Sequence, residues 1–160
     1  MKVRVVWLGR PSASPYESQV ETYRKRVARR WPSEDRPLRP ISGGRDRDPA
    51  RALRLEAETL ERQFEAGWHV VALDERARDR PSRDFATWLA ALEDGGRPGV
   101  MFVVGSDLGL DGTIIERADG RLSLSSMTLP HLLARLVLWE QLFRSTQILG
   151  GGAYHRVGVQ

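Results

Sequence analysis

Short apolar runs alternate along this chain with longer segments in which apolar residues recur every three or four positions. The short runs predict strands at residues 3–8, 38–41, 70–73 and 100–104. Strands that take turns with helices along a sequence are typical of an α/β fold. We therefore predict a mainly parallel sheet flanked by helices.

The segment SPYE, residues 14–17, has the features of a helix start. Ser14 can act as the N-cap, Pro15 suits the first helical position, and Glu17 completes a capping box. Val20 and Val27 follow on one face of the predicted helix. The same spacing predicts three further helices, over residues 49–66, from Ser82 onward, and from Pro130 to about residue 148.

The pattern is not interrupted by a repeat or a linker. A chain of 160 residues is long enough to bury one core, so we expect a single domain over residues 1–160.

The stretch LSLSSMTLPH, residues 122–131, joins two patterns. Leu122 and Leu124 alternate with serines as in a strand, but the alternation stops at Ser126, and Pro130 opens the last helix. The sequence thus predicts a turn of small hydroxyl residues at the mouth of a helix.

The strand at residues 100–104 ends in a turn with Gly105 and Gly109. Ligands of open α/β sheets bind at the carboxyl ends of strands. The backbone of residues 124–129, with Leu124 and Leu129 as apolar walls, would form a pocket suited to a purine if it lies at the same edge. The same residues also fit an ordinary core with serine turns, so both interpretations stay open. The spacing differs from the dinucleotide fingerprint G-x-G-x-x-G, which disfavours a Rossmann-type enzyme.

The positive charge of the chain favours a partner that carries phosphate groups. The 25 Lys and Arg residues outnumber the 21 Asp and Glu residues, and only Lys2 and Lys25 are lysines. Arginine suits bidentate contact with phosphate, and RKRVARR at residues 24–30 would bring such charge to the first helix. GC-rich coding and a solvated helix face are alternative explanations.

The sequence has no cysteine, which excludes disulfides, thiolate nucleophiles and cysteine-ligated zinc. The three histidines are too scattered to suggest a metal site. Arg4 within the first apolar run is wrong for a secretory signal, and no run approaches the length of a membrane span. We expect a cytoplasmic protein without a membrane segment or a metal.

Three segments together, LSLSSMTLPH, the following LLARLVLWEQLFRS and the terminal AYHR, resemble the SPOUT class of knotted methyltransferases. Within that class the chain is similar to the ribosomal RNA large-subunit methyltransferase H family, which methylates N3 of a pseudouridine in 23S rRNA. The resemblance covers the whole chain. It implies an S-adenosylmethionine-dependent rRNA methyltransferase that acts as a homodimer on assembled ribosomes.

The resemblance also implies a C-terminal trefoil knot, threaded by the helix after Pro130, and a set of site residues. The cofactor-binding residues would be Leu73, Gly105, Leu124, Ser125, Ser126, Met127, Thr128 and Leu129. The catalytic residues would be Tyr154, His155 and Arg156 in the tail, approaching the site across a dimer interface.

Two positions depart from the family pattern. Ser106 stands where relatives have a second glycine, and Ala77 stands where a glycine is expected after the strand at residues 70–73. These departures would suit a non-catalytic ribosome-binding or RNA-binding module that keeps the knotted fold, which is the alternative hypothesis.

Overall fold

The computed structural model describes residues 1–41 and 48–151. Within these ranges the chain forms one five-stranded sheet in the order β2-β1-β4-β3-β5, and each neighbouring pair is parallel. The strands are β1 (Lys2–Leu8), β2 (Ser33–Leu38), β3 (His69–Leu73), β4 (Gly99–Val104) and β5 (Gly120–Leu122). The predicted fold class, an α/β fold with a parallel sheet, is confirmed.

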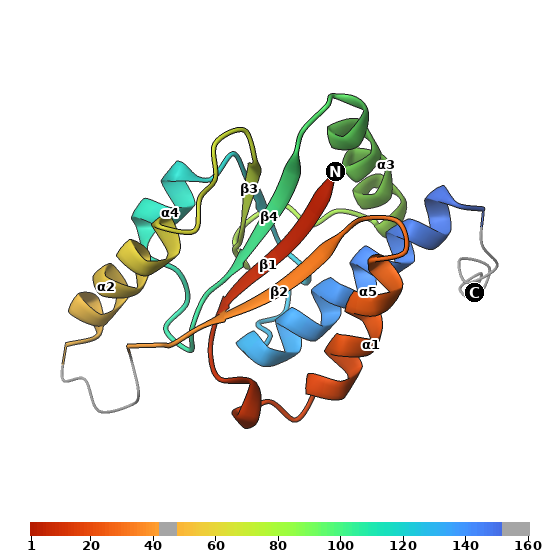
Figure 1. Ribbon diagram of the computed structural model, residues 1–160. Coiled ribbons are helices and arrows are strands. Elements are labelled where there is room, and N and C mark those ends of the chain that lie inside the picture. Colours follow the sequence, from red (N-terminus) through yellow and green to blue (C-terminus); the bar gives the residue numbers. More distant parts are fainter. Residues whose placement is uncertain (42–47, 152–160) are drawn as a thin grey trace.

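Helices cover both faces of the sheet (Figure 1). One face carries α1 (Glu17–Val27), α3 (Ser82–Asp94) and α5 (His131–Leu149), and the other carries α2 (Pro49–Glu61) and α4 (Gly112–Arg117). None of the described helices is long and apolar enough to cross a membrane.

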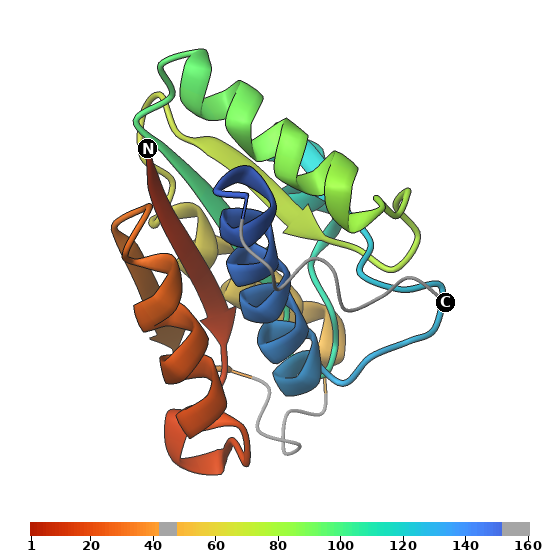
Figure 2. The same ribbon diagram turned by 90° about the vertical axis from the view of Figure 1, so that its right-hand side faces the viewer.

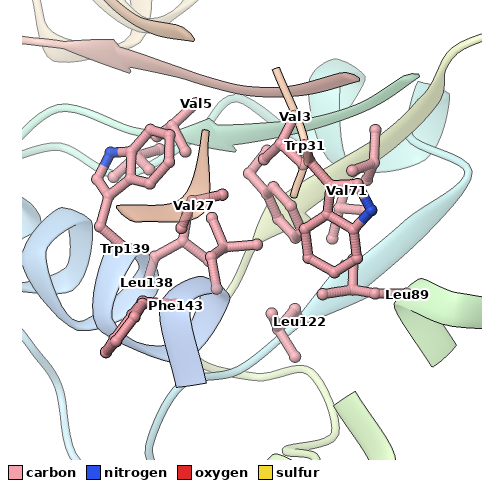
Figure 3. Packing of buried hydrophobic residues seen from close by; sticks show 14 of the residues in the cluster. Val3, Val5, Val27, Trp31, Val71, Leu89, Leu122, Leu138, Trp139 and Phe143 are labelled. Atoms are coloured by element: carbon pink, nitrogen blue, oxygen red, sulfur yellow. The ribbon is translucent and has the colours of Figure 1, made fainter. Parts of the chain in front are cut away.

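The two faces of β1 separate two apolar cores. Val3, Val5 and Trp7 point into the larger core with α1, α3 and α5, whereas Val6 and Leu8 point into the smaller one with α2 and α4. Alternate residues of a strand face opposite sides of a sheet, which explains why residues 3–8 are apolar on both faces except for Arg4, whose guanidinium pairs with Glu34 and Glu65. Figure 3 shows part of the larger core, where side chains of β1, α3 and α5 gather.

Helix α5 occupies the centre of one face although it follows the strand at the sheet edge. Residues 123–130 lead the chain back from β5, and α5 then lies between α1 and α3 (Figure 2). Its Leu138, Trp139 and Leu142 are fully buried. The main core therefore depends on the last described helix.

A buried arginine cluster joins α5 to β2 and α1. Arg135 is fully buried and donates to both carboxylate oxygens of Asp35, at 3.0 and 2.6 Å, and to both of Glu17, at 2.8 and 3.0 Å. The indole N–H groups of Trp7 and Trp139 also donate to Asp35, at 2.8 and 2.7 Å. Burial opposes the charge of Arg135, but these hydrogen bonds outweigh it and raise the pKa of the guanidinium.

Several sequence predictions were wrong in detail. The second strand lies at residues 33–38 rather than 38–41, and the last begins at Gly120 and ends at Leu122. The second helix ends at Glu61, before the expected boundary. The first helix starts at Glu17, because Pro11–Ala13 form a separate 3-10 turn and the Ser14 hydroxyl accepts the N–H of Tyr16 instead of capping the helix.

Candidate active site

A cavity of about 610 Å³ opens at the carboxyl ends of three neighbouring strands. Leu73, Val104 and Leu122 line it from the last residues of β3, β4 and β5. The turns that follow these strands form its rim, and His131 and Ala134 contribute the first turn of α5. Ligand-binding pockets of proteins commonly measure about 300–1,000 Å³.

Most of the predicted cofactor-binding residues come together in this cavity. Its lining includes Leu73, Gly105, Leu124, Ser125, Met127, Thr128 and Leu129. Ser126 is exposed in the same turn and does not line the cavity. Tyr154, His155 and Arg156 lie outside the described residues.

The hydroxyl-rich turn is closed by its own serines. Ser123 donates through Oγ to the Ser125 carbonyl at 2.8 Å, and the N–H of Met127 donates to Ser125 Oγ at 2.9 Å. In the described part of the chain, the N–H groups of Leu124, Ser125, Ser126, Thr128 and Leu129 form no hydrogen bond. The turn therefore presents a row of unpaired backbone groups beside apolar side chains.

The turn after β4 is tight because its two glycines approach closely. The N–H of Gly109 donates to the Ser106 carbonyl at 2.9 Å, and a Cβ added to Gly105 would overlap the backbone of Gly109. Gly109 itself has a φ of +84°, which favours glycine. Gly105 is thus needed for the turn itself, a reason that differs from the direct ligand contact inferred from the sequence.

Ser106 is built into this turn. Its Oγ donates to the carboxylate of Glu56 on α2 at 2.8 Å and accepts the N–H of Leu108 at 3.3 Å. Glu56 is only 1% exposed and also accepts the N–H of Ile41. The hydroxyl therefore ties the turn to α2.

Carboxylates at the rim give the cavity an acidic side. Asp74 follows β3 directly, and its side chain is 10% exposed with Arg121 3.7 Å away. Asp107 follows β4, and its Oδ1 lies 2.8 Å from Nδ1 of His131 without forming a hydrogen bond. Each aspartate follows the end of a predicted strand, and this position was a signal that the sequence offered. The sequence prediction nevertheless missed both, because acidic residues are common in surface turns.

Solved structures of methyltransferases share this fold. A tRNA (m1G37) methyltransferase from Aquifex aeolicus superposes with a TM-score of 0.52 at 12% identity, covering 90% of this chain and 70% of that one. A probable methyltransferase from Bordetella pertussis Tohama I gives a TM-score of 0.53 at 16% identity, covering 90% and 95%. At such low identity these likenesses concern the fold alone.

Comparison of sequences identifies the family. The family described as "Predicted SPOUT methyltransferase" matches residues 1–155. The chain is 41% identical to the ribosomal RNA large subunit methyltransferase H of Acidiphilium cryptum, over 98% of this chain and 95% of that protein. It is 40% identical to the protein of that name from an Anaeromyxobacter species, over 98% and 100%. The chain therefore belongs to the SPOUT methyltransferases, in the ribosomal RNA large-subunit methyltransferase H family.

Proposed function

We propose that the protein transfers a methyl group from S-adenosylmethionine to N3 of a pseudouridine in 23S rRNA, acting on assembled ribosomes. The observation that carries the proposal is the cavity at the ends of β3, β4 and β5, lined by seven of the eight residues expected to hold the cofactor. Membership of the family supplies the reaction class.

The residues of the cavity fit the adenosine part of the cofactor. Leu122, Leu124 and Leu129 offer apolar walls, and the N–H groups of residues 124–129 other than that of Met127 offer donors for the edge of a purine. A flat heterocycle is held well by apolar contact on its faces and a few polar groups at its edge.

The acidic rim fits the methionine part. The mostly buried carboxylate of Asp74 and the carboxylate of Asp107 favour a ligand that carries positive charge. When bound, S-adenosylmethionine supplies an electrophilic methyl group on a sulfonium. The role of the chain is to hold the ligand and the RNA base in line and to keep water away from them.

The target nitrogen must give up its N–H proton as it accepts the methyl group. We assign the handling of this proton, and contact with the RNA, to Tyr154, His155 and Arg156. An imidazole with an ordinary pKa near 6.5 is suited to proton transfer at neutral pH.

We further propose that the protein is a cytoplasmic, single-domain homodimer in which the tail of one subunit approaches the cavity of the other, with α5 threading the family's trefoil knot. Met127 and Leu108 support a partner at this rim, because their side chains line the cavity yet are 74% and 40% exposed. The return of the chain from edge strand β5 to central α5 supports the threading.

No observation favours the non-catalytic alternative. It depended on Ser106 and Ala77, but the Ser106 hydroxyl is held by Glu56 and by the N–H of Leu108. Ala77 is not part of the cavity lining and closes a turn through its N–H to the Asp74 carbonyl.

The test uses ribosomes from a strain that lacks this gene. Incubation with the purified protein and isotopically labelled S-adenosylmethionine should add one methyl group to one pseudouridine of 23S rRNA, detected by mass spectrometry of nuclease fragments. A methyl group found on another base or RNA, or none despite calorimetric binding of the cofactor, would contradict the proposal.

A further inference from the structure

A second, smaller cavity lies next to the candidate active site, at the sheet edge formed by β5. It has a volume of about 150 Å³ and is bounded by β3, β5, α3 and the loop before α3. The lining includes His69 of β3, Trp88 of α3, Arg80 of the loop and Arg121 of β5. The function proposed above makes no use of this cavity.

His69 lines the cavity, and its Nε2 lies near the lining residue Gly120, 3.5 Å from the position of a Cβ there. The Nδ1 of His69 is buried and has no hydrogen-bond partner among the described residues. Burial lowers the pKa of His69, which favours the neutral imidazole, although the nearby Asp119 carboxylate opposes this shift. Buried polar groups are normally satisfied by protein, water or a ligand, and a neutral imidazole nitrogen can bond to the edge of a heterocycle.

Trp88 supplies a fixed aromatic wall. Its ring is stacked on Phe85 at 5.7 Å between centroids and meets the edge of His69 at 5.6 Å. The guanidinium of Arg80 lies over the same indole, 5.2 Å from the centroid. Unpaired RNA bases stack on aromatic rings and on guanidinium planes of this kind.

Among the described residues, the lining contains one carboxylate, that of Asp119, which accepts the N–H of Val70 at 2.8 Å, and two arginines, which give the cavity a net positive rim. Arg80 and Arg121 are exposed, and in the described ranges Arg80 makes no ion pair. Arg121 has its nearest carboxylate oxygen, from Asp74, at 3.7 Å. Side chains so placed can contact the phosphate of a nucleotide whose base enters the cavity.

The small cavity and the large one share a wall. Leu122 lines both, and Asp74 of the large cavity pairs with Arg121 of the small one. The two cavities are therefore adjacent at this edge of the sheet.

We propose that the small cavity binds an unpaired base of the ribosomal RNA that lies close to the target nucleotide. The inference rests on the proposed function and adds a recognition site to it. Sequence-specific proteins commonly read RNA by splaying bases out of single-stranded loops, and a second base held next to the target would select one site in a large RNA.

Gly120→Val tests this by filling the cavity without changing charge. Gly120 lines the cavity, and a Cβ there would lie 3.5 Å from Nε2 of His69, which is ordinary contact. Valine also suits a strand. The KM for ribosomes from the deletion strain should rise about tenfold or more, the scale of one lost stacking contact. The affinity for S-adenosylmethionine and the thermal midpoint should stay at the parent values.

Arg80→Gln is the second variant, and Thr87→Val is the matched control. Arg80 is exposed, so its replacement leaves folding intact. Arg80→Gln should raise the KM for ribosomes severalfold, and it tests the inference even if Gly120→Val does not fold. Thr87 is exposed one position before Trp88, and its variant should behave as the parent. A KM within twofold of the parent in both cavity variants, or an equal rise in the control, overturns the inference. If the parent itself transfers no methyl group to these ribosomes, the proposed function fails and the inference fails with it.

Discussion

At the scale of single residues, the glycine turn after β4 shows how tightly the backbone is packed at the cavity. Any side chain on Gly105 would overlap the carbonyl group of Gly109, so the turn must move to admit even a methyl group. The same turn lines the cavity through residues 105–110. A change at Gly105 therefore acts on the site through the backbone.

We expect Gly105→Ala to lower the affinity for S-adenosylmethionine at least tenfold, because the displaced turn narrows or opens the cavity. Calorimetric titration measures this. Gly112→Ala is the control, since a Cβ at Gly112 meets no atom within 4 Å. Parent-like affinity in the Gly105 variant would mean that the cofactor lies elsewhere.

Arg135 is the residue on which the buried charge cluster depends. Arg135→Met would leave the carboxylate of Asp35, whose side chain is 9% exposed, without its cation. Removing one partner of a buried ion pair costs about 3–5 kcal/mol. The free energy of unfolding, measured with urea, should fall by that amount.

The control for this experiment is Arg62→Met, which breaks an exposed pair with Glu58 at 3.9 Å. Surface pairs of this kind contribute about 0–1 kcal/mol. The double variant Asp35→Asn, Arg135→Met should recover part of the lost stability, because the carboxylate that then lacks its cation is that of Glu17, which is 42% exposed to water. Equal effects of the Arg62 and Arg135 variants would show that the cluster does not stabilise the fold.

At the scale of elements, the strands and helices with a regular spacing of apolar residues were predicted from the sequence. The strands at the centre of the sheet, β1, β3 and β4, are buried on both faces and read as apolar runs, interrupted within β1 by Arg4. The helices α2, α3 and α5 were recognised by their buried stripes, and Asp48 accepts the N–H of Arg51 as an N-cap should. These elements can therefore be predicted from the spacing of their own apolar residues and from their own capping residues.

The bounds of strand β2 were not predicted, because its polar residues are stabilised by partners in other elements. The strand reads SEDRPL, and its polar side chains are satisfied by partners far away in sequence: Glu34 binds Arg4, and Asp35 binds Arg135 and two tryptophans. Nothing local predicts such pairings. The cavity shows a related limit, since the residue pattern suggested its turns at Gly105 and at residues 124–129 but left an ordinary core open until the resemblance favoured a cofactor site. The small cavity at His69 was not predicted from the sequence.

The C-terminal tail and the hydroxyl-rich turn are separate elements and should be separable in experiment. Removing the residues after Gly152 should leave the affinity for S-adenosylmethionine nearly unchanged, because the turn is fixed by hydrogen bonds of Ser123 and Ser125. Methyl transfer should collapse, and His155→Ala alone should slow it about 10²-fold or more, the usual scale for a positioned acid or base.

Both quantities are measured on the same truncated protein, by cofactor titration and by single-turnover methylation of ribosomes. Arg156→Ala provides a contrast, because the loss of one phosphate contact should mainly weaken binding to ribosomes and reduce its salt dependence. If truncation abolishes cofactor binding as well, the tail belongs to the cofactor site. If truncation changes neither quantity, the tail has no role in the reaction.

At the scale of the whole molecule, the assignment of the tail to a partner's cavity requires a dimer. Sedimentation at micromolar protein concentration should give twice the mass of the chain. Met127→Glu should shift the protein toward monomers and reduce methyl transfer, because it places a charge on an apolar side chain that is 74% exposed at the rim. A fully active monomer would contradict this arrangement.

The central position of α5 also determines when the protein can fold. Synthesis releases the chain from its N-terminus, so the strands of the sheet leave the ribosome before the helix whose Leu138, Trp139 and Leu142 complete the core. Arg135 joins Asp35 and Glu17 only at that late stage, and until then both carboxylates lack their cation. A nascent chain that has passed β5 but not α5 therefore leaves the apolar surface between α1 and α3 uncovered. The main core thus forms only once α5 itself has left the ribosome.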